Sequence, residues 1–151
     1  MEKGKRKRGA LRKIPVLAIG LFCFVIVGLD FPSGGVKVEN AYVRVAAKGM
    51  MSAAYFEIFN SSDAPDTLYQ VSVEFAKMAQ LHESFRKDGM VGMKEVKFVA
   101  IPSGGNVVFK PGGYHVMLMD VKKDLKTGGE VDLKLFFKRA GQVEIQAEVK
   151  E

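Results

Sequence analysis

The chain contains only two histidines, and one of them stands beside methionines in a short β-like segment. The segment GGYHVMLMD, residues 112–120, places His115 and Met117 two positions apart. Residues two apart in a β-strand point to the same face, so this imidazole and thioether would lie together, about 6.6 Å apart along the chain. A thioether is a soft ligand that suits Cu(I), while an imidazole accepts several metals. The pair therefore predicts half of a metal site.

The second histidine, His82, lies in a predicted β-hairpin. Asp88 and Gly89 form a strong signal for a two-residue hairpin turn, and counting outward from that turn places His82 opposite Glu95. His82 and Met93 would then be diagonal neighbours on one face, about 7–8 Å apart. Two such pairs brought together would make a site of two imidazoles and two thioethers. Glu95 is expected to be a solvated strand residue, with a hydrogen bond to His82 as the alternative.

The ligand types select the metal. Structural zinc normally uses cysteine or more histidines, a hard cation would require a carboxylate cluster, and a blue-copper electron carrier needs a thiolate. The sole cysteine, Cys23, lies in an apolar N-terminal segment, outside the patterned region. The four ligands therefore favour Cu(I). Because a thioether holds no proton at working pH, the set suits storage or transfer of the ion better than redox catalysis.

The other methionines have a plainer interpretation. A lone methionine in a β-protein usually fills the core, and this is the expectation for Met50, Met51 and Met78. Met119 stands two positions after Met117. Met119 is expected to pack beneath the site; the alternative is that it is a fifth ligand.

The segments that carry these residues belong to a region with β character throughout. Short runs alternate between apolar and polar residues or are rich in β-branched and aromatic ones, and Gly-rich turn sequences separate them. Eight or nine strands spaced about ten residues apart predict an all-β domain built as a sandwich or barrel. The runs cover residues 36–45, 53–60, 67–75, 78–86, 91–99, 106–110, 114–121, 131–137 and 142–149.

Charge is concentrated at the N-terminus. Residues 1–13 hold seven Lys/Arg and one Glu, which equals the whole formal net charge of +6. The remainder of the chain is neutral, so a nucleic-acid-binding face is not expected. Residues 14–29 are uncharged and would span roughly 24 Å as a helix, somewhat less than the roughly 30 Å hydrocarbon core of a bilayer. A basic segment before an apolar one predicts a signal peptide or membrane anchor that exports the rest.

This leader divides the chain into residues 1–35 and a β-domain over residues 36–151. Small residues up to Gly35 permit cleavage there, and an uncleaved helical anchor through residues 14–29 is the alternative. Cys23 is not preceded by small residues, which argues against a lipoprotein signal.

The candidate ligands follow a spacing that resembles a known family. That family is the periplasmic copper(I) chaperones associated with the CuA site of cytochrome c oxidase. The similarity covers most of residues 36–151, including NAYVR, AAYFEIFN and the long run that begins IPSGGNVVFKPGGYHVMLMD. Tyr42 stands where the family usually has Trp. The pattern His-x10-Met-x21-His-x-Met falls on His82, Met93, His115 and Met117.

The resemblance implies a cupredoxin-like, Greek-key β-sandwich on the periplasmic side of a bacterial cytoplasmic membrane. It also implies that the four patterned residues bind Cu(I). The ion would be delivered to the oxidase subunit that carries CuA, often alongside Sco-type thiol proteins. One departure is local, because the family often has Met two positions before the ligand Met93. Val91 stands there in this chain, and Met90 is shifted by one.

Two other functional classes are alternatives to the carrier. An enzyme is not expected, because no GxSxG elbow is present and copper oxidase chemistry would need further histidines. A membrane-anchored β-sandwich that serves as an interaction domain without metal is the alternative, although it leaves the His/Met spacing unexplained.

Overall fold

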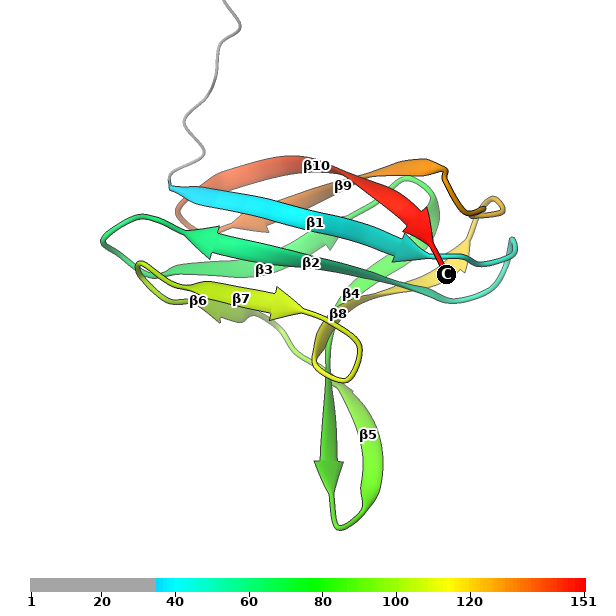
Figure 1. The fold of residues 1–151 in the computed structure, drawn as a ribbon, viewed down its shortest axis with the longest axis horizontal. Coiled ribbons are helices and arrows are strands. Elements are labelled where there is room, and N and C mark those ends of the chain that lie inside the picture. The colour runs from blue at the N-terminus through cyan, green and yellow to red at the C-terminus, as the bar shows by residue number, and fades with distance from the viewer. Residues whose placement is uncertain (1–34) are drawn as a thin grey trace, which may run out of the picture. The chain divides into compact units, whose positions relative to one another are not determined.

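The computed structural model describes residues 35–151, which fold as an all-β domain (Figure 1). The predicted β segments are confirmed, except that residues 91–99 divide into two strands around a bend at Lys97. The strands of this part of the chain are β1 (Val36–Arg44), β2 (Ser52–Asn60), β3 (Asp66–Ser72), β4 (Ala76–Lys87), β5 (Met90–Glu95), β6 (Val99–Ile101), β7 (Asn106–Phe109), β8 (Tyr114–Val121), β9 (Glu130–Phe137) and β10 (Gly141–Lys150).

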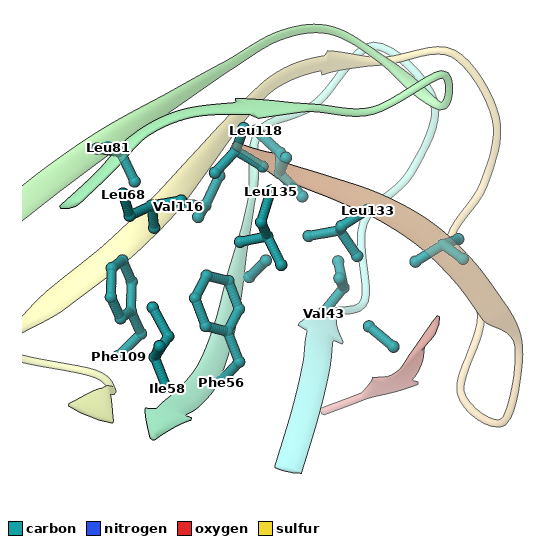
Figure 2. Close-up of a cluster of buried hydrophobic side chains, with 14 of the residues drawn as sticks. Val43, Phe56, Ile58, Leu68, Leu81, Phe109, Val116, Leu118, Leu133 and Leu135 are labelled. Atoms are coloured by element: carbon teal, nitrogen blue, oxygen red, sulfur yellow. The ribbon is translucent and has the colours of Figure 1, made fainter. Parts of the chain in front are cut away.

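Hydrogen bonds join these strands into one continuous sheet in the order β5-β4-β8-β7-β2-β1-β10-β9-β3-β6. The two halves are linked through β1, which pairs antiparallel with β2 and parallel with β10. The sheet curves over a single core, because Leu68 of β3 and Leu81 of β4 belong to the same buried cluster (Figure 2). These strands stand far apart in the sheet order, so only strong curvature can bring their side chains together.

Alternation along the central strands decides which side chains reach this core. Phe56 of β2 and the pair Val116 and Leu118 of β8 are buried in the cluster (Figure 2). Since successive strand residues point to opposite faces, His115 and Met117 lie on the other side of the sheet. The core therefore fixes the position of β8, and the opposite face of β8 is left to carry the imidazole and the thioether.

The predicted leader lies outside the described residues. The signal peptide or anchor over residues 14–29 and the position of Cys23 therefore stay predictions. Within residues 35–151, no helix is long and apolar enough to cross a membrane.

Candidate metal centre

The two histidines face each other across neighbouring strands. His82 of β4 and His115 of β8 are direct register partners, and their ring centroids are 5.8 Å apart. A metal–nitrogen bond of about 2 Å would place each ring centroid roughly 3 Å from a shared ion. Two such lengths span about 6 Å, so the observed separation fits one ion held between the two imidazoles.

The His115 ring is fixed by its neighbours on the inner side of this site. Its side chain is only 5% exposed. Its Nδ1–H donates to the carbonyl oxygen of Gly113 at 3.1 Å, and because a carbonyl only accepts, this bond assigns the proton to Nδ1. The unprotonated Nε2 is then free to bind a metal, and the bond to Gly113 orients the ring.

Tyrosine rings extend this packing away from the site. Tyr55 of β2 lies against His115 with ring centroids 6.4 Å apart, and Tyr42 of β1 lies 5.0 Å from Tyr55. Burial raises the pKa of the Tyr55 phenol, so the hydroxyl stays neutral beside the imidazole at physiological pH. Tyr42 therefore supports the site through Tyr55, at the position where the family usually has Trp.

The His82 ring has one nitrogen engaged and one orphaned. Its Nε2–H donates to the side-chain oxygen Oε1 of Gln80 at 3.3 Å, whereas Nδ1 is buried with no hydrogen-bond partner. A buried nitrogen without a partner is costly unless another ligand satisfies it. A metal ion bound at Nδ1 would remove that cost, so His82 also fits a metal-binding role.

The thioethers flank the two imidazoles. Met117 stands two positions after His115 on the same face of β8, opposite Gln80 of β4. The predicted hairpin register is confirmed, with Ser84 opposite Met93. Met93 therefore lies diagonally from His82 on one face of the hairpin, as predicted.

The hairpin formed by β4 and β5 projects from the body of the domain (Figure 1). Phe85 and Gly92 are register partners on the face opposite Met93, and a Cβ at Gly92 would come within 2.6 Å of the Phe85 ring. Glycine thus lets the ring lie directly over the neighbouring strand. Met93 itself is 58% exposed, so the candidate site has a buried inner wall and an accessible outer thioether.

Three supporting residues were not foreseen as part of the site. Tyr55 packs on His115, Gln80 binds His82, and Gly113 supplies the acceptor for the other ring. The alternation of AAYFEIFN placed Tyr55 on one face of its strand, but nothing in the sequence assigned that strand as a neighbour of β8. Glu95 is exposed, as expected of a solvated strand residue, and the side-chain hydrogen bond that the structure gives His82 is to Gln80.

The expectation that three further methionines fill the core is wrong. The side chains of Met50, Met51 and Met78 are 60%, 62% and 50% exposed. Met78 is the register partner of Met119, and Met119 lies on the face of β8 that is away from the core. Both side chains therefore point away from the core. Alternation distinguishes two faces of a strand but does not say which face is buried.

Within residues 35–151, no group of three or more His, Cys, Asp or Glu side chains is placed to hold a metal ion. In this part of the chain His82 and His115 are therefore not joined by a third side chain of these types. Thioethers are soft donors that suit Cu(I) beside imidazoles.

The electrostatics of His82 give a measurable pH dependence. Burial lowers the pKa of its imidazole below 6.5, the facing His115 lowers it further, and Glu95 partly opposes both. We expect the NMR titration midpoint of His82 in the metal-free protein to lie below 6.5 and to rise in His115→Ala. Because the unfolded state takes up the proton first, this group favours unfolding as the pH falls from about 6.5 through the folded-state pKa. A midpoint above 6.5 would contradict this account.

Fold and site together define a small all-β domain that carries a face suited to a soft metal. The chain belongs to the LpqE-like family, because the family model described as "Putative lipoprotein LpqE-like" matches residues 36–149. A relative from Leifsonia xyli subsp. xyli, named "Putative lipoprotein Lxx21020", is 32% identical over 118 residues. The match covers 78% of this chain and 70% of that protein.

Solved structures with the same fold include domains determined with copper bound. The copper-bound PCuAC domain from PmoF2 matches with a TM-score of 0.66 at 29% identity, covering 78% of this chain and 93% of that one. The solution structure of CuI-DR1885 from Deinococcus radiodurans matches with a TM-score of 0.57 at 32% identity, covering 75% and 78%. The family resemblance read from the sequence is confirmed.

Proposed function

We propose that the β-domain of this chain is an extracytoplasmic Cu(I) carrier without enzymatic activity. One ion would be held by His82, Met93, His115 and Met117. The observation that carries this proposal is the facing pair of imidazoles. In each ring one nitrogen donates a hydrogen bond, and the second nitrogen of the same ring is unprotonated and free to bind a metal. The copper-bound PCuAC domain and CuI-DR1885, which share the fold, support the choice of metal.

The ligand set suits an ion that must be passed on. The four ligands are neutral, so the site adds no negative charge to the bound Cu(I). The thioethers also release the ion without taking up a proton. His115 forms the buried wall, whereas Met93 is exposed on the projecting hairpin. An incoming ligand from an acceptor can therefore displace Met93 first, while the inner ligands still hold the ion.

The finer fold assignment is a cupredoxin-like, Greek-key β-sandwich. The curvature of the single sheet over one core supports it, because two halves of the sheet then face each other as the layers of a sandwich do.

The domain would work on the periplasmic or extracytoplasmic face of a bacterial cytoplasmic membrane. The basic and apolar leader, residues 1–35, supports export, and the lipoprotein names of the family model and of the Leifsonia relative are consistent with a membrane-associated place. The acceptor would be the oxidase subunit that carries the CuA site, with Sco-type thiol proteins acting alongside. Transfer of the ion from the loaded domain to an isolated CuA domain would test this step.

Methionine variants on the hairpin test the ligand assignment. We expect Met93→Leu to weaken Cu(I) binding about tenfold or more, because leucine keeps the size of the side chain and loses the sulfur. The measurement is an anaerobic competition titration of residues 36–151 with a chromophoric Cu(I) chelator. Met90→Leu is the matched control, since Met90 lies on the same strand, is 71% exposed and is three positions from Met93, on the opposite face. Equal affinity of both variants would remove Met93 from the site.

A membrane-anchored interaction domain without metal is the second candidate. The projecting hairpin carries exposed apolar side chains on both faces, Phe85 on one and Val91 on the other, and Phe98 follows it; this apolar surface is the observation that favours a protein partner. If the wild-type domain fails to compete with the chelator for Cu(I), the interaction domain becomes the favoured function.

A further inference from the structure

Two exposed methionines and a half-buried one lie near the ends of neighbouring strands, next to the His/Met site. Met78 of β4 and Met119 of β8 are direct register partners, so their side chains share a face. This is also the face of Met117, which stands two positions before Met119.

Met51 approaches Met119 from the other side of β8. Met51 precedes Ser52, and Ser52 is the register partner of Leu118. The side chain of Leu118 is buried in the core, so Ser52 lies on the core side as well. By alternation Met51 points away from the core, to the face of Met119. The chain before β2 stays alongside β8, because the amide of Val121 donates to the carbonyl oxygen of Met50 at 3.0 Å. Met51 in the segment that leads into β2, Met119 of β8 and Met78 of β4 therefore follow one another side by side, and we call them the Met row.

Packing does not explain the Met row. Met51 and Met78 are 62% and 50% exposed, and the core lies on the opposite face of these strands. The backbone of Asp120 has a φ of 52°, and the alternation ends there, since Leu118 and Val121 are both buried. The Met row is thus the last part of the outer face before the strand turns its side chains inward.

The chemistry of the Met row fits a soft monovalent ion. Adjacent strands are about 4.8 Å apart, and methionine has a flexible, unbranched side chain, so the three sulfurs can converge above Met119. Three thioethers carry no charge and no proton, which favours Cu(I) over hard divalent cations. The nearest carboxylate along β8, that of Asp120, is already paired with Lys77.

We propose that the Met row is a second Cu(I) site, weaker than the His/Met site, which binds an incoming ion before it moves to Met117. The proposal rests on the proposed function, since it requires that the His/Met site hold Cu(I). Met117 and Met119 are about 6.6 Å apart along the strand, so one thioether can replace another on the ion in short steps. The ion keeps its oxidation state, and no proton is taken up or released.

The test uses the full-length chain in detergent, labelled with ¹³C at the methionine methyl groups and titrated anaerobically with Cu(I). Single Met→Leu variants assign each methyl signal. We expect the first equivalent to shift the signals of Met93 and Met117, and the second to shift the three signals of the Met row. Met50 and Met90, which are also exposed, serve as internal controls and should stay unchanged.

A triple variant, Met51→Leu with Met78→Leu and Met119→Leu, separates this site from the first one. We expect it to weaken binding of the second ion about tenfold or more and to leave the affinity for the first ion within about twofold. Met50→Leu is the matched control, because Met50 is an exposed neighbour that is not in the row.

Two results would overturn the inference in distinguishable ways. If the second ion shifts Met50 and Met90 as much as the Met row, or binds the triple variant as tightly as the wild type, the row is not a site and the carrier function stands. If the first ion shifts neither Met93 nor Met117, the proposed function itself fails, and the second site fails with it.

Discussion

His115→Ala is expected to weaken Cu(I) binding of the β-domain by roughly 100-fold or more, the largest effect of any single substitution at the site. His115 is the most deeply placed candidate ligand, because its ring is packed between Tyr55 and His82 and held by the carbonyl of Gly113. Removal of the ring deletes a ligand and also leaves a space that the remaining ligands cannot close. The anaerobic chelator competition described above measures the loss.

Two further measurements keep this result interpretable. Because alanine leaves a ring-sized space beside Tyr55, added free imidazole should restore part of the Cu(I) affinity of His115→Ala. Gln80→Ala, which removes only the hydrogen bond to His82, should cost about tenfold. An affinity of His115→Ala within threefold of wild type, with the fold intact by circular dichroism, would show that His115 is not a ligand.

Phe56→Ala is expected to lower the free energy of unfolding by about 3–5 kcal/mol, the largest effect on stability. Phe56 is 2% exposed in the centre of the core and stacks on Phe109 with ring centroids 4.5 Å apart (Figure 2). The substitution removes apolar burial, opens a cavity and breaks an aromatic pair that contributes about 0.5–1.5 kcal/mol beyond its area. Urea unfolding of residues 36–151 gives the measurement.

Phe98→Ala is the matched control, because the Phe98 side chain is 60% exposed and its loss should cost less than about 1 kcal/mol. Below the unfolding transition, Phe56→Ala should bind Cu(I) as the wild type does, since Phe56 lies on the core side of its strand and the site lies on the other. Similar losses of stability in both variants would contradict the assignment of Phe56 to the centre of the core.

The local parts of the site could be predicted from the sequence. The two-residue period of a strand places His115 and Met117 on one face, and no distant residue can change that without a bulge. The Asp-Gly turn sets the hairpin register, which places His82 and Met93 on one face as predicted. Both inferences succeeded because they depend on backbone geometry within a few residues.

The exposure of the methionines could not be predicted in the same way. The sequence predicts Met50, Met51 and Met78 in the core only on the general ground that a lone methionine in a β-protein usually fills the core. Which of two faces is covered depends on where the rest of the sheet curves, and the curvature of this sheet leaves that face open. The Met row is visible only once the strands are placed side by side.

The sequence by itself determined the strands, the pairs of candidate ligands that share a face and the family to which the chain belongs. Only the tertiary structure decided that β4 lies next to β8, that His82 faces His115 at 5.8 Å between ring centroids, and that Tyr55 supports the pair. The reason is physical: pairing between strands far apart in the chain is selected by how the whole sheet buries its apolar face. No short stretch of sequence contains that information, because the free energy of burial is shared by all ten strands of residues 35–151.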